Sequence, residues 1–390
     1  MRPDAAELAD AAADWRSAYV HIPFCARVCP YCDFAVVAGR DDLADVYLGA
    51  LVAEIGSEQE WHPLDAVYLG GGTPSRFGAY RLNTSVEALA ARFGIAADAE
   101  VSLEANPEDW DLELARALRA GGFNRVSFGA QSFDPDTLRY LGRSHGPRDV
   151  ASAVDAARVA GFESVNIDLI FGAPGESSWE DTMTSALSLD PDHLSLYALT
   201  VERGTALSRA VASGAPGPDP DEQADRWEHA VETAGPAGFV RYEISNFARS
   251  GHHCRYNLSV WARGEYLGFG SGAHAFRDGI RRRNVRRIEA YLERVSTGVG
   301  PVQGVEEVTG WAAELERVMI GLRRTAGVAA GPGVERLLES DDGKRLVEAG
   351  ILVAGERLVV ARPLLTDMAV RAVIGLDPPA GWLSVSTPER

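Results

Sequence analysis

Short apolar runs alternate with segments of helical spacing from about residue 17 to residue 245. The apolar runs fall at 19–22, 66–69, 101–104, 125–128, 165–170 and 194–199, with 239–244 following. Between them, apolar residues recur at helical intervals near 79–92, 111–120, 148–160, 178–188 and 221–234. A further helix is expected where Leu43, Val46, Tyr47, Ala50 and Leu51 form one apolar stripe. The pattern predicts buried strands that alternate with amphipathic helices.

Such an alternation is typical of a parallel sheet covered by helices. Six strand–helix units predict an α/β fold in the form of a complete or partial (β/α)6 barrel. A doubly wound open sheet is the alternative. The segment 203–220 is rich in Gly, Pro and Ala, and it is expected to be a loop.

Beyond residue 245 the alternation stops. The region 305–375 reads as helices followed by a hairpin at 350–361, with Gly355 and Glu356 in its turn. We therefore expect four parts along the chain. They are an N-terminal extension (1–16), the barrel (17–245), a barrel-closing region (246–304) and a small winged-helix-like α+β domain (305–390).

Composition narrows the class of protein. The 390 residues are 46% hydrophobic and 24% charged, as in an ordinary globular protein, and the formal net charge is −18. This acidity disfavours nonspecific binding to nucleic acid or to anionic membranes, without excluding peripheral contact with a membrane. The chain shows neither a signal-peptide pattern nor an apolar run long enough to span a bilayer. A cytoplasmic location is expected.

Three of the four cysteines lie within eight residues, in the segment HIPFCARVCPYCDF at 21–34. Cysteine thiolates are the usual ligands of iron–sulfur clusters, and Cys25, Cys29 and Cys32 would leave one iron of a four-iron cluster open. A zinc site normally requires four ligands, and His21 is the only adjacent candidate. His21 is expected to pack at the end of the first strand. Three unrelated cysteines are the remaining alternative.

The spacing Cys-x3-Cys-x2-Cys after the first strand, with Tyr31 before the last cysteine, resembles the radical S-adenosylmethionine superfamily. The resemblance implies a [4Fe-4S] cluster whose open iron binds the amino and carboxylate groups of S-adenosylmethionine. It also implies that the reduced cluster cleaves this cofactor to a 5′-deoxyadenosyl radical. The cofactor carries the chemistry, and the protein positions and shields it.

Further motifs follow the successive strands: GGGTP at 70–74, LEANPE, SFGAQS, LGRSHG and NIDLIFGAP. Each alone could hold a capping or surface residue, but together they resemble the coproporphyrinogen-oxidase-like branch of the superfamily. A guanidinium such as that of Arg143 suits the methionine carboxylate. The residues that the resemblance implies as S-adenosylmethionine contacts are Tyr19, Tyr31, Gly71, Gly72, Thr73, Glu104, Gln131, Arg143 and Asp168.

Two subgroups of this branch differ beside the cysteine triad. The oxygen-independent coproporphyrinogen III oxidases carry an extra cysteine two residues after the triad and a longer N-terminal segment. Here that position is Phe34, and only 18 residues precede Tyr19. Both features favour the HemW-type haem chaperones. The alternatives are an oxidase or another radical enzyme acting on a tetrapyrrole, or a degenerate member that keeps only the cluster.

The segment 242–261 also resembles the chaperone group, whose haem-binding motif is His-Asn-x-x-Tyr-Trp. Here Tyr256 replaces the histidine and Val260 the tyrosine, while Asn257 and Trp261 remain. A tyrosine can ligate haem iron. Nearby His252, His253 and Cys254 are alternative ligands, and a purely structural loop is the other interpretation. The resemblance implies three partners: haem, an unidentified haem-accepting protein, and an electron donor such as flavodoxin or ferredoxin. The sequence names no catalytic residue.

Overall fold

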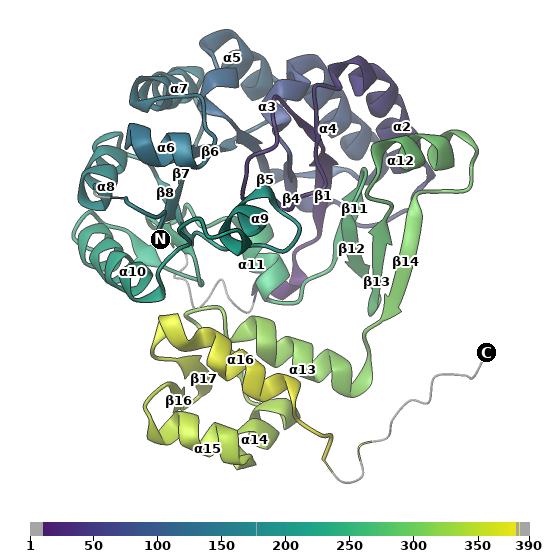
Figure 1. The fold of residues 1–390 in the computed structure, drawn as a ribbon. Helices are drawn as coiled ribbons and strands as arrows, with labels where there is room; N and C mark the ends of the chain where they lie inside the picture. Colours follow the sequence, from purple (N-terminus) through teal and green to yellow (C-terminus); the bar gives the residue numbers. More distant parts are fainter. Residues whose placement is uncertain (1–10, 177, 380–381, 383–390) are drawn as a thin grey trace.

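The computed structural model describes residues 11–176, 178–379 and 382. A large α/β part and a smaller C-terminal part are distinct in Figure 1. Residues 1–10 of the expected N-terminal extension lie outside the described residues. In the described part, no helix is both long enough and apolar enough to cross a bilayer.

Six parallel strands form the centre of the large part, side by side in the order in which the chain forms them. They are β1 (Ser17–Ile22), β4 (Leu64–Gly71), β5 (Ile95–Ala105), β6 (Arg125–Gln131), β7 (Ser164–Phe171) and β8 (His193–Ala198). All six apolar runs up to residue 199 therefore form strands, as predicted. Strands that pair in sequence order are typical of a β/α barrel rather than of a doubly wound sheet.

Further strands extend both edges of this sheet. Beyond β1 lie β11 (Tyr266–Phe269), β12 (His274–Arg277), β13 (Ile280–Asn284) and β14 (Val302–Glu307). Beyond β8 lie β10 (Asn246–Ala248) and β9 (Val240–Arg241). Among the described residues the two outermost strands, β14 and β9, do not pair with each other, so the barrel is partial and open.

The predicted strand at 239–244 is wrong in its extent. Only Val240–Arg241 is extended, and the chain then turns back into β10. The turn forms because the Glu243 carboxylate accepts a hydrogen bond from the Ser245 N–H at 3.2 Å, and the Tyr242 N–H donates to the Asn246 carbonyl. A polar side chain inside an apolar run has thus converted one expected strand into a tight hairpin.

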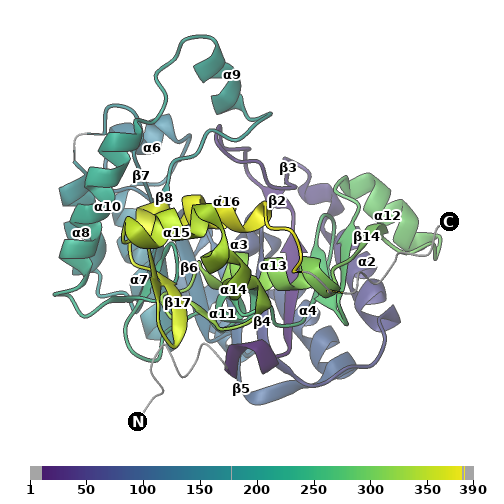
Figure 2. The same cartoon turned by 90° about the horizontal axis from the view of Figure 1, so that it is seen from below.

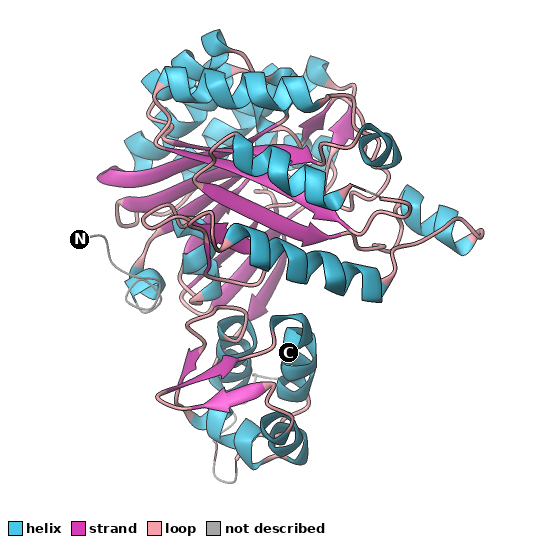
Figure 3. Ribbon diagram, turned by 90° about the vertical axis from the view of Figure 1, so that its left-hand side faces the viewer, coloured by secondary structure: helices cyan, strands magenta, loops and turns pink. Residues whose placement is uncertain are grey.

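Helices cover the outer face of the sheet, in an arc that Figure 1 shows and that is seen edge-on in Figure 3. The main ones are α2 (Ala44–Ser57), α4 (Ala79–Phe93), α5 (Leu112–Ala120), α7 (Pro147–Ala160), α8 (Trp179–Ser188) and α10 (Pro220–Ala234). The predicted stripe on α2 is wrong at Val46, which is 59% exposed. The buried face is centred on Tyr47, Leu51 and Ile55, and Val46 lies beside it.

The loop expected at 203–220 contains a helix, α9 (Ala206–Ala212). Thr205 caps it, because the Thr205 hydroxyl accepts the Ser208 N–H at 3.1 Å. Leu207 is buried against Leu141, Ile170 and Leu199. One cap and one buried leucine are therefore enough to form a short helix in a segment otherwise rich in Gly and Pro.

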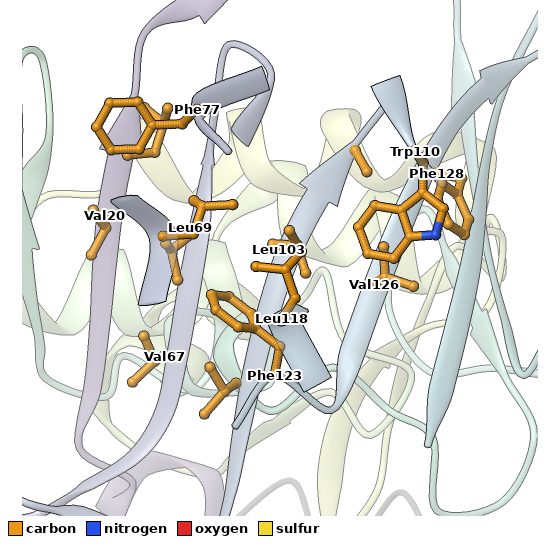
Figure 4. Close-up of a cluster of buried hydrophobic side chains, with 14 of the residues drawn as sticks. Val20, Val67, Leu69, Phe77, Leu103, Trp110, Leu118, Phe123, Val126 and Phe128 are labelled. Carbon is orange, nitrogen blue, oxygen red and sulfur yellow. The ribbon is translucent and has the colours of Figure 1, made fainter. Parts of the chain in front are cut away.

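Strand residues alternate between an apolar outer face and a polar inner face. Figure 4 shows Val67, Leu69, Leu103 and Val126 from the outer face in one cluster with helix residues such as Leu118. The intervening residues line the inner face, and they include Ser102, Glu104, Ser127, Asn166, Asp168 and Ser195. Since polar groups are rarely buried without partners, this inner face is suited to hold a ligand or a hydrogen-bonded network.

The C-terminal domain has a hydrophobic core of its own. It comprises α13 (Gly310–Gly321), β15 (Val328–Ala329), α14 (Pro332–Glu339), α15 (Asp341–Glu348), β16 (Leu352–Ala354), β17 (Arg357–Val360) and α16 (Thr366–Ile374). The hairpin predicted at 350–361 is confirmed, with Leu352 paired to Val360. Seen from below, this domain lies in front of the large part (Figure 2). Arg263 joins the two parts through an ion pair with Glu316 at 2.9 Å.

Candidate functional site

A cavity of about 360 Å³ opens at the carboxyl ends of the parallel strands. In a β/α barrel this is the end at which functional residues gather. The predicted residues that line the cavity are Cys25, Cys29, Tyr31, Cys32, Gly71, Gly72, Thr73, Glu104, Gln131, Arg143 and Asp168. All three cysteines and eight of the nine expected S-adenosylmethionine contacts therefore share one space.

The glycine turn after β4 holds the start of the cysteine loop. The Gly72 N–H donates to the Ile22 carbonyl and the Thr73 N–H to the Phe24 carbonyl, both at 2.8 Å. A Cβ at Gly72 would lie within 2.9 Å of backbone atoms of residues 22–24, so only glycine fits there. The loop that follows returns at β3 (Val37–Ala38), which pairs with β2 (Phe24–Cys25). Both ends of the loop are thus fixed to the sheet.

The three cysteines are free of disulfides, and polar groups lie beside two of them. The Thr73 hydroxyl lies 3.6 Å from the Cys25 sulfur, and Arg143 Nη1 lies 3.7 Å from the Cys29 sulfur. Burial raises the pKa of Cys25 to about 11, so the metal-free thiol is protonated near neutral pH. Metal binding at this loop would therefore release protons.

The cysteine loop does not form a site for a single metal ion among the described residues. Across the described ranges, no three Cys, His, Asp or Glu side chains converge on a point where one ion could be held. A cubane cluster needs no such convergence, because each cysteine binds a different iron. Three thiolates in one loop suit three irons of such a cluster.

His21 packs at the end of β1, as expected. Its ring bonds to the Tyr19 hydroxyl at 3.0 Å and to the Ala35 carbonyl at 2.8 Å, and it lies against Gly71. Burial lowers the pKa of His21 to about 4, so the ring is neutral at physiological pH. Both ring nitrogens are engaged, which leaves His21 a structural role in supporting the glycine turn.

Two buried carboxyls face the cavity from neighbouring positions of the inner face. Glu104 accepts the Gly71 N–H at 3.0 Å and the Tyr68 hydroxyl at 2.8 Å. Asp168 accepts the Ser127 hydroxyl at 2.9 Å and the Asn166 amide at 2.7 Å. Burial raises the pKa of both carboxyls, that of Glu104 to about 7. Each can bind a ligand hydroxyl or ammonium group, and a cation there would lower these pKa values again.

Arg143 is a partly buried cationic group in the lining of the cavity, which also includes Arg27. Arg143 Nη2 donates to the Asn106 side chain and to the Gly129 carbonyl, while its buried Nε has no partner among the described residues. An orphaned guanidinium nitrogen in a cavity is suited to an anionic ligand group. Asn106 is a site residue that the sequence reasoning missed, although it lies within the quoted LEANPE segment. Tyr197, which also lines the cavity, carried no motif signal.

Tyr31 connects the cysteine loop with α9. Its ring packs against the cluster that contains Leu141 and Leu207, and the Leu207 N–H donates to the Pro30 carbonyl at 2.8 Å. The helix that the sequence pattern did not predict therefore covers one side of the cysteine loop.

Tyr19 is the expected contact that does not line this cavity. Its ring lies 5.9 Å from the Tyr256 ring and 6.3 Å from the Tyr68 ring, in a stack below the cavity. Tyr256 belongs to α11 (Arg255–Trp261), a short helix that packs against β1 and β4. Asn257 faces the polar interior beside Asn166, in a space of only about 40 Å³.

The remaining residues expected to contact haem lie apart from Tyr256. Trp261 lies beside the C-terminal domain, with the Arg323 guanidinium 5.7 Å from its ring centre. His252 and His253 line a third cavity, of about 490 Å³, at the opposite end of the strands. The five residues expected to contact haem therefore lie at three separate places in the structure.

Comparison with known proteins agrees with this geometry. Residues 19–186, which contain the triad and every strand end up to Asp168, match the family model of the radical SAM superfamily. The heme chaperone HemW of Bacillus subtilis is 35% identical over 361 residues, which cover 88% of this chain and 94% of that protein. The HemW of Mycobacterium tuberculosis is 40% identical over 376 residues, covering 92% and 94%. The chain belongs to the HemW family.

Membership of the HemW family agrees with the expectation from Phe34. The coproporphyrinogen III oxidase of Escherichia coli has the same fold, with a TM-score of 0.80 over 95% of this chain and 92% of that one. At 24% identity this likeness concerns the fold alone. It nevertheless supports a radical SAM fold with an appended C-terminal domain.

Proposed function

We propose that this protein is a haem chaperone, which binds haem and transfers it to an acceptor protein. The observation that carries the proposal is the extent of the likeness to proteins named heme chaperone, which spans both the barrel and the C-terminal domain. Phe34 adds a local argument. It occupies the position of the additional oxidase cysteine and is 63% exposed at the mouth of the cavity, where it offers no ligand.

We further propose that the chain holds a [4Fe-4S] cluster through Cys25, Cys29 and Cys32, with S-adenosylmethionine beside it. The bound pair would supply one-electron chemistry. Of the chain's own residues, Arg143 would bind the carboxylate of the cofactor through its unpaired Nε. Glu104 and Asp168 would bind hydroxyl or ammonium groups, and Gly71 lets the backbone approach closely. α9 would support the cluster loop through the hydrogen bond from the Leu207 N–H to the Pro30 carbonyl.

The proposal includes partners and a location that the family resemblance implies. An electron donor such as flavodoxin or ferredoxin would reduce the cluster, and an unidentified acceptor would take the haem. A cytoplasmic location suits this chemistry, because a reducing compartment keeps the three thiols available for iron. The net charge of −18 disfavours nucleic acid as a partner. Contact with a membrane would be peripheral.

A haem titration of the cluster-reconstituted protein tests the function. We expect saturable binding near micromolar haem, followed by transfer to a haem-free acceptor such as apomyoglobin, each recorded by absorption. Absence of saturable binding would contradict the chaperone function while leaving the cluster site intact. The matched enzymatic assay supplies coproporphyrinogen III, reductant and S-adenosylmethionine. Sustained double decarboxylation in that assay would favour the oxidase instead.

A further inference from the structure

The cavity of about 490 Å³ lies at the amino ends of β5, β6 and β7, opposite the cysteine loop. Its floor comes from the strand ends, at residues 98–100, 124–125 and 163–164. Its wall comes from the segment 251–255, which immediately precedes α11, together with Trp15 and Leu258. Nothing in the cofactor site described above uses this space.

The segment 251–255, the histidine segment, is fixed to the strand ends by two hydrogen bonds. Arg125 Nη1 donates to the His252 carbonyl at 2.8 Å, and the Arg255 N–H donates to the Glu100 carboxylate at 2.9 Å. These bonds set the direction in which residues 252–254 enter the cavity wall. The segment is therefore organised before any ligand arrives.

His253 lines this cavity, and one nitrogen of its ring is buried without a partner in the described part of the chain. The residue is only 9% exposed, and its Nδ1 has no hydrogen-bond partner among the described residues. The ring is held edge-to-face against Tyr242 at 4.8 Å, and Tyr242 is fixed in turn by the His193 ring at 2.8 Å. Burial lowers the pKa of His253 to about 4, which leaves the ring neutral and able to donate a lone pair to a metal.

Tyr256 is not placed to ligate a metal in this cavity. Its ring lies 5.1 Å from Tyr68 and 5.9 Å from Tyr19, in the stack that fills the lower interior of the barrel. The space beside the neighbouring Asn257 is about 40 Å³, which admits a water molecule and not a macrocycle. Ligation by Tyr256 would require this stack to open.

The charges around the larger cavity are balanced. Three carboxylates face it, and each has an arginine partner: Asp98 with Arg255 at 3.3 Å, Glu100 with Arg125 at 3.9 Å and Glu163 with Arg119 at 2.7 Å. Trp15 adds an aromatic face and Leu258 an apolar one. An amphipathic, flat ligand with two carboxylates fits such a lining, since its propionates can replace a carboxylate at a partly exposed arginine such as Arg255.

We propose that haem binds in this cavity with His253 as its axial ligand, at the opposite end of the barrel from the cluster. This assignment rests on the proposed haem-chaperone function. It names the ligand that replaces the histidine missing from position 256, and it separates the haem from the cofactor cavity.

Haem titrations of single variants in the full chain test the assignment. His253→Gly should weaken ferric haem binding at least tenfold and change the ferric absorption spectrum. Added imidazole should restore the spectrum by filling the vacated position. Tyr256→Phe keeps the ring stack and should behave like the wild type. The matched histidine control is His274→Ala on β12, which is exposed and remote from the cavity.

Iron-free protoporphyrin separates ligation from simple macrocycle contact. We expect its affinity to be the same in the wild type and in His253→Gly, because no iron is present to be ligated. A spectrum changed by Tyr256→Phe but not by His253→Gly would overturn the assignment while leaving the chaperone function in place. If the wild type itself binds no haem, the proposed function fails. Far-ultraviolet circular dichroism of each variant shows whether it has folded.

Discussion

The two ends of the parallel sheet carry cavities of comparable size, about 360 and 490 Å³, but the two are built differently. At the carboxyl ends, one or two polar groups come from each of several successive strands. At the amino ends, a single segment, 251–255, supplies both histidines and lies across three strand starts. The first cavity is a property of the repeated β/α unit, whereas the second depends on one connection outside the repeat.

This difference explains why sequence patterns identify the site at the carboxyl ends more readily than the site at the amino ends. Alternation along each strand directs residues such as Glu104 and Asp168 inward, and the parallel order then brings their strand ends together. The histidine segment has no such periodic constraint. Its position is fixed by Arg125 and Glu100, whose side chains reach it from strands more than 100 residues earlier.

Removing the cluster is the experiment that best distinguishes the functions of the two ends of the sheet. Cys25→Ala, Cys29→Ala or Cys32→Ala should each abolish the iron retained after anaerobic reconstitution, about four irons per chain in the wild type. Haem binding at the amino ends should persist in the same variants. Iron analysis and haem difference spectra measure the two effects independently.

Cys254 provides the control for these cysteine variants. It is buried within the segment 251–255 and does not line the cavity that holds the triad. Cys254→Ala should keep the full iron content. If this variant lost its iron while a triad variant kept it, the placement of the cluster would be refuted.

Asp168→Ala should weaken binding of S-adenosylmethionine without loss of iron. A hydrogen bond to a charged group contributes about 1.5–3 kcal/mol, so the dissociation constant should rise roughly 10- to 100-fold. Asp98→Ala removes a carboxylate at the opposite end and should leave this affinity unchanged. Equilibrium dialysis of the reconstituted protein makes the measurement, and equal affinities in the two variants would remove Asp168 from the cofactor site.

Gly72→Ala tests how tightly the glycine turn supports the cysteine loop. Because a Cβ would meet backbone atoms within 2.9 Å, we expect a loss of about 1–3 kcal/mol in the free energy of unfolding. Gly49→Ala on α2 meets no atom within 4 Å and should instead stabilise the chain by about 0.5–1 kcal/mol. Urea unfolding compares the two. Equal stabilities would show that the turn tolerates a side chain.

The sequence patterns predicted most features of the repeated β/α units and few of the features that occur once in the chain. The strand positions up to residue 199, the gathering of the motifs at one end and the hairpin after Gly350 all followed from local patterns. The helix α9 was missed because it depends on one cap at Thr205 and one buried contact of Leu207, neither of which produces a periodic signal. The strand expected at 239–244 was shortened by the Glu243 side chain, which periodicity does not take into account.

The haem motif shows more clearly the limit of prediction from spacing along the chain. Spacing alone placed Tyr256, Trp261 and the two histidines within ten residues, and so within reach of one ligand. The helix α11 then directs Tyr256 into the ring stack and leaves Trp261 against the C-terminal domain. Proximity along the chain therefore does not imply a shared site where a helix begins between the residues.

The smallest expected effect is on the pH dependence of the free energy of unfolding. Its sign is opposite for Glu104 at one end of the sheet and His253 at the other. Burial raises the pKa of Glu104 to about 7, above the ordinary value of 4.5, so between these values the folded chain keeps a proton that the unfolded chain has lost. This group therefore makes the free energy of unfolding fall as pH rises. Burial lowers the pKa of His253 to about 4 from 6.5, so between these values the unfolded chain holds the extra proton. This group makes the free energy of unfolding rise with pH.

Other buried groups titrate in the same range, so the variants are compared by their slopes and not by their absolute stabilities. Between about pH 5 and pH 6.5, Glu104→Gln should make the slope of unfolding free energy against pH more positive, and His253→Asn should make it more negative. Each change is at most about 1.4 kcal/mol per pH unit. Urea unfolding of the cluster-free chain at several pH values gives the slopes. Slopes that moved in the same direction would mean that at least one of the two side chains is not buried as the structure places it.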